Sequence, residues 1–139
     1  MKWLSSLVAA LTLVACSDAF KPSIQNVSGV YRAQSFTTTD SGGTHDWIAK
    51  GASLVLLLAP PGVSGGQLIL PDTTSGGFTI MLLEGTWTLH GDVVDFDQPA
   101  DTFVRDVAWI ATKDRLTADQ TFSGTRIKVV LLRDNTTRT

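Results

Sequence analysis

Residues 85–97 read GTWTLHGDVVDFD, and this stretch decides the fold class. Before the central turn, apolar Trp87 and Leu89 alternate with polar side chains, and after it Phe96 stands between two aspartates. Successive side chains of a β-strand point to opposite faces, so each half has the pattern of a strand with one buried face. Gly91 can adopt the positive φ that a tight turn needs. The stretch therefore predicts a β-hairpin.

The same pattern continues on both sides of this hairpin, with turn residues roughly every ten positions. The alternation is most regular at 115–122. The strand expected at 77–83 either ends before the hairpin or continues into it, and residues 44–52 are ambiguous. Further strands are expected at 29–37, 53–59, 67–70, 103–111 and 126–133.

The strands and their short connections indicate an all-β domain, because no segment has a convincing amphipathic helix pattern. About eight consecutive strands joined by hairpins favour an antiparallel up-and-down meander. A meander of that size can close into a barrel, and closure removes free strand edges. A two-sheet β-sandwich is the alternative, but Greek-key sandwiches need longer crossover connections than these turns provide.

Composition agrees with one β-rich domain and argues against a nucleic-acid partner. The chain has 139 residues, which suits a single compact core. Of its 13 acidic residues only Glu84 is a glutamate, and aspartate favours turns where glutamate favours helices. The net charge is -2 and the 11 Lys and Arg residues form no basic block, so binding to nucleic acid is not expected.

The N-terminus has the features of a secretory signal. Lys2 is followed by a mostly apolar, uncharged run at residues 3–14. As a helix this run would be about 18 Å long, too short to cross the ~30 Å hydrocarbon core of a bilayer. A charged start and a short apolar core are typical of an exported chain. We therefore expect residues 1–15 to be a signal peptide.

Residues 13–16, Leu-Val-Ala-Cys, resemble the lipobox of bacterial lipoproteins. The resemblance implies cleavage before Cys16 and attachment of a diacylglyceryl group, with palmitate-type acyl chains, to its thiol. Cys16 is the only cysteine, so it has no partner for an internal disulfide, and acylation accounts for it. Two or more acyl chains anchor a protein stably. Ser17, in place of aspartate, favours the outer membrane over the inner membrane.

These features divide the chain into four parts. The parts are the signal peptide at 1–15, lipidated Cys16 with a flexible tether through residue 28, a β-domain at 29–134 and a polar tail at 135–139. We expect a monomer that contacts a membrane through its lipid. Its other partner is either a small apolar ligand or a protein of the cell envelope.

The β-domain resembles that of small lipocalin-like bacterial lipoproteins. Three short motifs carry the resemblance: Ser-Gly-Val-Tyr at 28–31, the hairpin that begins GTWTL, and Val-Val-Leu-Leu-Arg at 129–133. Lipocalins open with Gly-x-Trp and place a late basic residue against that tryptophan ring. Here Tyr31 stands where tryptophan would be, and Arg133 is its expected partner. The resemblance implies an up-and-down barrel of a kind that can enclose an apolar cavity.

Four residues are candidates for ligand binding: Arg105, Phe103, Trp109 and Trp87. If 103–111 forms one strand, Phe103, Arg105 and Trp109 share a face. An arginine inside an apolar barrel would need an anionic partner, such as a fatty-acid carboxylate. In the interpretation that we prefer, a bulge turns Arg105 outward or an internal ion pair neutralises it.

No catalytic, cofactor or metal site is expected. His45 lies in a predicted loop and His90 in a predicted turn, without the convergent ligands that zinc or copper needs. The near match Gly-Val-Ser-Gly-Gly at 62–66 lacks the spacing of a nucleophile elbow. The aspartates within 92–97 lack the looped frame of a calcium site. We therefore do not expect an enzyme.

Two functions from different classes remain. In the first, the barrel holds a small apolar ligand in its interior. In the second, large inward side chains such as Trp87, Trp109, Phe96 and Phe122 fill the barrel. The protein is then a non-catalytic structural or protein-interaction module of the cell envelope. A void in the interior would favour the first function, and a filled core would favour the second.

Overall fold

The computed structural model describes residues 19–72 and 74–135. Cys16 and the expected signal peptide at 1–15 lie outside the described residues, as do residues 136–139 of the expected tail. The described chain is mostly β-structure with two one-turn helices. Its elements are α1 (Ile24–Val27), β1 (Gly29–Asp40), β2 (Gly43–Asp46), β3 (Ser53–Ala59), β4 (Val63–Pro71), β5 (Phe78–Leu82), β6 (Gly85–His90), β7 (Val93–Asp97), α2 (Phe103–Asp106), β8 (Trp109–Thr112), β9 (Arg115–Phe122) and β10 (Thr125–Arg133).

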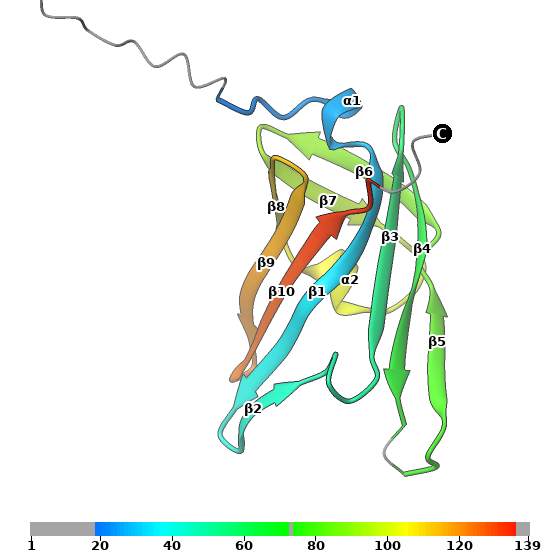
Figure 1. Cartoon of the computed structure of the whole chain (residues 1–139), viewed down its shortest axis with the longest axis vertical. Helices are drawn as coiled ribbons and strands as arrows, with labels where there is room; N and C mark the ends of the chain where they lie inside the picture. Colours follow the sequence, from blue (N-terminus) through cyan, green and yellow to red (C-terminus); the bar gives the residue numbers. More distant parts are fainter. Residues whose placement is uncertain (1–18, 73, 136–139) are drawn as a thin grey trace, which may run out of the picture.

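Eight of the ten strands form a closed antiparallel barrel (Figure 1). Around the ring their order is β1–β3–β4–β6–β7–β8–β9–β10, and β10 pairs with β1 to close it. Ring neighbours are also neighbours along the chain once β2 and β5 are set aside, so the barrel is an up-and-down meander. The barrel predicted from the sequence is confirmed, and the sandwich alternative is wrong.

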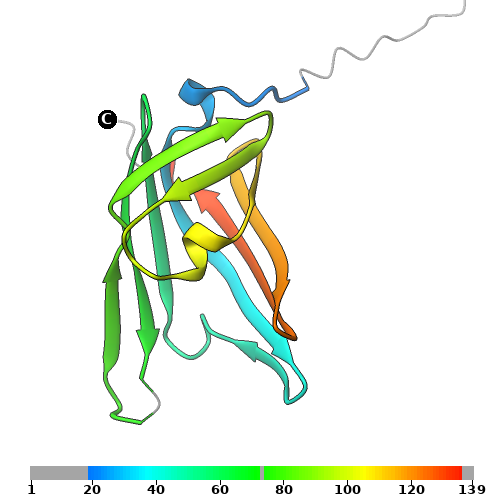
Figure 2. The same cartoon turned by 180° about the vertical axis from the view of Figure 1, so that it is seen from behind.

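The two remaining strands, β2 and β5, lie outside the ring. On one edge of β1, residues 29–32 pair with β3 while residues 37–40 pair with β2. On one edge of β4, residues 63–64 pair with β6 while residues 67–71 pair with β5. β5 and β6 are thus successive stretches along the same edge of β4, with a break between them. The β4–β5 hairpin extends beyond the ring at the end opposite α1 (Figures 1 and 2).

Alternate residues of the barrel strands point inward and form the buried core. In β3, Leu54, Leu56 and Leu58 are buried while the intervening Leu57 is 40% exposed. Because a strand alternates its faces, one apolar run supplies both core and surface. The largest fully buried side chains are Trp109, Tyr31, Leu54, Leu56, Leu58, Leu68, Leu83, Leu116, Leu131, Val27, Val94 and Val104.

Residues 103–111 do not form the single strand that we expected, and that prediction is wrong. Phe103–Asp106 form α2, and β8 begins only at Trp109. The side chain of Thr102 caps the helix by accepting a hydrogen bond from the N–H of Val104. Apolar side chains three and four positions apart suit a helical turn as well as a strand, and a cap of this kind favours the helix.

Helix α2 reaches across the interior of the barrel. It lies between β7 and β8 in the chain, and its Phe103 packs against Phe36 of β1 with ring centroids 5.1 Å apart. Because β1 and β7 lie on opposite sides of the ring, this contact spans the barrel. Figure 2 shows the helix (yellow) in front of β1 and β10, within the curve of the strands. The helix takes up interior space that an open barrel would leave to a ligand.

Residues 24–28, which we assigned to the flexible tether, belong to the folded domain. Ser23 and Asn26 form a capping box, in which each side chain accepts a hydrogen bond from the backbone N–H of the other residue, at 3.2 and 2.7 Å. Val27 is buried in the core. The folded part therefore begins at α1 and not at Gly29.

The contact between Tyr31 and Arg133 that the lipocalin resemblance implied is present. The two residues face each other in the register of β1 and β10. The guanidinium carbon lies 5.4 Å from the ring centroid, and Nη2 donates a hydrogen bond to the phenolic oxygen at 2.8 Å. Tyr31 donates to the carbonyl of Val27 at 2.5 Å, and Arg133 donates to that of Asn26. Burial raises the pKa of Tyr31, and the hydrogen bond from Arg133 opposes that rise.

Candidate functional site

The four residues that we considered for ligand binding lie on three different elements. Arg105 and Phe103 lie on α2, Trp109 opens β8 and Trp87 lies in β6. Phe103 and Trp109 meet, with ring centroids 6.4 Å apart. Trp87 instead packs at the turn between β3 and β4, and Arg105 turns toward the loop before α2. Phe103 and Trp109 are thus in contact, whereas Trp87 and Arg105 form their hydrogen bonds elsewhere.

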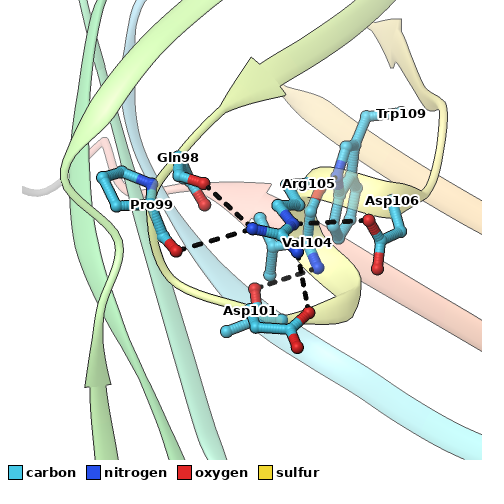
Figure 3. A network of polar contacts seen from close by, with 8 residues as sticks. Gln98, Pro99, Asp101, Val104, Arg105, Asp106 and Trp109 are labelled. Atoms are coloured by element: carbon cyan, nitrogen blue, oxygen red, sulfur yellow. Dashed lines mark hydrogen bonds and ion pairs between the residues drawn. The ribbon is translucent and has the colours of Figure 1, made fainter.

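Arg105 is held by acceptors of its own segment (Figure 3). Its Nη2 lies 2.8 Å from the carboxylate of Asp101, and its Nε lies 3.5 Å from that of Asp106. Its Nη1 lies 3.4 and 3.5 Å from the carbonyl oxygens of Gln98 and Pro99. With its side chain 35% exposed, the arginine joins the preceding loop to α2. A helix, and not the bulge that we had considered, turns it away from the interior.

Trp109 is the centre of an aromatic cluster that fills this part of the barrel. It is 0% exposed, and its indole N–H donates to the carbonyl of Val104 at 2.9 Å. The ring of Phe96 meets it edge-on, with 6.5 Å between centroids and 89° between planes. Phe103 lies between Trp109 and Phe36. The Trp109 side chain is therefore enclosed by its neighbours in the core.

Trp87 has a similarly enclosed position at another point of the core. Its indole N–H donates to the carbonyl of Ala59 at 3.0 Å, and its backbone N–H donates to the carbonyl of Gly62 at 2.8 Å. A side chain on Gly62 would come within 3.0 Å of the Trp87 carbonyl oxygen. Trp87 therefore fixes the turn between β3 and β4 against β6, which is a structural role.

Gln98 is a buried polar residue that the sequence pattern did not indicate. It is 2% exposed, and its Nε2 donates to the carbonyl of Leu83 at 3.1 Å and to the hydroxyl of Ser64 at 3.4 Å. Gln98 thus satisfies a carbonyl at the break between β5 and β6. Its Oε1 has no hydrogen-bond partner among the residues that the structure describes. In the sequence it precedes Pro99 in an expected turn, and that position gives no signal of burial.

An apolar surface outside the barrel was also not expected from the sequence. Phe78, Ile80 and Leu82 of β5 are 62%, 60% and 60% exposed. Leu57 of β3 and Val63 of β4 are exposed too, and the register of the three strands places all five residues on the outward face. β3, β4 and β5 contain no charged residue. We refer to these five residues as the outer apolar face.

An open depression of about 430 Å³ lies over the irregular pairing of β1 and β10 near Ala33. Arg32 and Arg133 contribute cationic groups to it, but both are already engaged within the chain. Arg32 lies 3.0 Å from Asp134, and Arg133 contacts Tyr31 as described above. The depression therefore has its charges matched internally.

Comparisons of this chain with protein-family models, with curated proteins and with solved structures return no match. Among the described residues, no three His, Cys, Asp or Glu side chains gather as a metal site would require. Neither helix in the described part of the chain is long and apolar enough to cross a membrane. The packing and the surface of this chain are therefore what bears on its function.

Proposed function

We propose that this protein is a lipid-anchored protein of the bacterial cell envelope, and that its barrel is a non-catalytic interaction module. The observation that carries the proposal is the close packing of the buried core. Trp109, Trp87 and Tyr31 are so enclosed that water has almost no access to them, and α2 packs across the barrel. A small-molecule site usually needs a cavity of roughly 300 Å³ or more, lined by such apolar groups.

The apolar surface available to a partner lies outside the barrel. The outer apolar face joins exposed side chains of three neighbouring strands that carry no charge. Contiguous exposed apolar surface often marks a protein–protein or membrane interaction site, whereas single exposed apolar residues are ordinary. This surface supports an interaction role over the storage of a ligand.

The anchor in this proposal is Cys16, on the strength of the lipobox at residues 13–16. Ser17 leads us to place the protein in the outer membrane. α1 lies at one end of the barrel and the β4–β5 hairpin extends from the other (Figure 1). A lipid attached upstream of α1 would therefore leave the outer apolar face uncovered.

Metabolic labelling with radioactive palmitate tests the anchor. In a bacterium with an outer membrane, the full chain should become labelled and should fractionate with that membrane. Cys16→Ser should abolish the label because it removes the acylated thiol. Ser17→Ala is the matched control, since it changes the next residue and keeps the thiol. A wild-type chain without label would contradict the anchor.

Native mass spectrometry tests the filled interior. The protein is extracted from its own envelope membranes and its intact mass is compared before and after denaturation. We expect the same mass per chain in both states, with only covalently bound lipid attached. A small apolar molecule that is lost on denaturation would show that the barrel carries a ligand, and it would contradict the proposed interaction module.

A further inference from the structure

β5 has an edge that pairs with no other strand among the described residues. Figures 1 and 2 both show this strand at the margin of the molecule. Natural proteins protect such edges with charges, proline or bulges, because an open edge pairs readily with another chain. Phe78–Leu82 reads FTIML and contains none of these. β2, the other added strand, has only four residues and includes Asp46.

The hydrogen-bond pattern identifies the β5 residues that face the open edge. The N–H of Leu83 donates to Gly66 at 3.0 Å, and the N–H of Asp72 donates to the carbonyl of Gly77 at 2.8 Å. In an antiparallel ladder such positions recur at every second residue, so the odd-numbered residues bond to β4. The even-numbered residues of 78–82 therefore direct their N–H and C=O groups to the open edge. The same residues expose apolar side chains.

This edge is complementary to a second copy of itself. An antiparallel pair centred on Ile80 places Ile80 opposite Ile80 of the second copy and Phe78 opposite Leu82. The residues that meet are those whose backbone groups already face the edge. Farther out, Glu84 lies opposite Gly76, so no like charges are opposed. All six apolar side chains lie on one face, and the two outer apolar faces become continuous.

We propose that β5 binds a second copy of this chain by antiparallel pairing about Ile80, which gives a dimer with two-fold symmetry. Such self-complementary interfaces are the commonest kind in soluble oligomers. The inference rests on the proposed interaction role and names its partner. It replaces the expectation of a monomer.

The size of the contact indicates a weak dimer. A large side chain presents on the order of 150–200 Å² when exposed, so three at about 60% provide roughly 300 Å² per copy. A standard interface buries ~800 Å² per partner. The ladder hydrogen bonds fix the geometry more than they add affinity. We therefore expect a dissociation constant on the order of tens of micromolar.

Sedimentation measurements test the association. The chain from residue 16 with Cys16→Ser retains every described element, and its average mass should rise from monomer to dimer between about 1 µM and 1 mM. Ile80→Lys places two ammonium groups across the axis and should raise the dissociation constant at least about tenfold. Leu57→Lys is the matched control: it alters the same face away from the edge and should leave the constant within about twofold. Circular dichroism establishes that each variant is folded.

Disulfide trapping tests the register. Because the chain has no other cysteine than position 16, a new one is a clean reporter. Ile80→Cys should cross-link to itself across the axis. Phe78→Cys and Leu82→Cys should each fail alone, since the same residue in two copies lies ~13 Å apart, but should cross-link when mixed.

Three results would overturn the dimer: a monomer at every concentration, an association that Leu57→Lys weakens as much as Ile80→Lys, or no cross-link at position 80. A barrel that carries a ligand would contradict the proposed function and would leave these measurements unchanged. Failure of the dimer would leave the filled interior as it stands.

Discussion

Replacing Tyr31 by phenylalanine removes one oxygen atom at the point where α1 meets the closing strands. That oxygen donates to the carbonyl of Val27 at 2.5 Å and accepts from Nη2 of Arg133 at 2.8 Å. Phenylalanine keeps the ring and its contact with the guanidinium, so the packing of the core is preserved. The substitution therefore isolates two hydrogen bonds from hydrophobic burial.

The loss of stability depends on which hydrogen bonds Val27 and Arg133 keep when the tyrosine oxygen is removed. Leaving a buried polar group without its hydrogen bond lowers stability by about 1–3 kcal/mol. Arg133 keeps its contacts with Asn26 and Asp114, so the carbonyl of Val27 is the group that is left unsatisfied by Tyr31→Phe. We expect a loss of about 2 kcal/mol. For a domain of this size that corresponds to a fall in Tm of roughly 5–10 °C.

Urea unfolding followed by tryptophan fluorescence measures this loss. A double-mutant cycle with Arg133→Met separates the direct hydrogen bond between the two residues, and we expect a coupling of about 1 kcal/mol. The matched control is Arg32→Ala, one residue along β1, where an exposed ion pair contributes less than about 1 kcal/mol. A loss below about 0.5 kcal/mol for Tyr31→Phe would refute the account of how α1 is fixed.

Tyr31 should also make the stability of the fold depend on pH in the alkaline range. Burial raises the pKa of Tyr31 above its usual 10.0, so at high pH the unfolded chain releases a proton that the folded chain keeps. The stabilising contribution is complete below pH 10.0 and is lost as pH rises through the folded pKa. The difference in stability between wild type and Tyr31→Phe should therefore shrink above pH 10. A difference that does not change with pH would contradict the shift.

Three further predictions concern the core, α2 and the β4–β5 loop. Trp109→Ala should lower stability by about 3–5 kcal/mol in urea unfolding, because it leaves a cavity, and a loss below about 2 kcal/mol would contradict the filled interior. Arg105→Ala should lower it by about 1 kcal/mol or less, because its ion pairs are partly exposed, and a larger loss would place the arginine in the core. Hydrogen bonds from the side chains and N–H groups of Thr74 and Ser75 hold the pKa of Asp72 well below its usual range. Their stabilising contribution is present above pH 3.8 and is lost as pH falls through the folded pKa. The Thr74 amide should therefore be protected from exchange at pH 4, relative to its intrinsic rate. This protection should be lost only in stronger acid, and it should already be absent at pH 4 in Asp72→Ala.

The ring of strands could be predicted because apolar and polar residues alternate along the chain over many positions. The hairpin at 85–97 is formed by β6 and β7, and the run at 53–59 is a strand with leucines on both faces. Elements of a single turn carry too few residues for any period to show. Ser23 and Thr102 start α1 and α2 by capping, but Ser23 was assigned to the tether and Thr102 lies outside the expected strands.

The candidate binding residues could not be placed correctly from the sequence. Phe103, Arg105 and Trp109 were expected to share one strand face, and the helical turn of α2 removes that relation. The contact of Tyr31 with Arg133 was predictable because both lie in regular strands that close the ring. Sequence patterns place residues on faces reliably only where the element itself is long enough to be identified.

The exposed residues of β5 lie on an open edge strand, unlike those of the strands that form the closed ring. Closing a barrel removes strand edges, yet this chain closes its ring with eight strands and then places β5 outside it. Ile80 points away from the core, so the fold does not depend on it, and Ile80→Thr should change stability by less than about 0.5 kcal/mol. The same substitution should weaken self-association, because it removes the apolar contact at the axis. Thermal unfolding and sedimentation of that one variant separate the two effects. A large loss of stability would show that Ile80 contributes to folding. A variant that is stable but monomeric would show that Ile80 contributes to dimerisation.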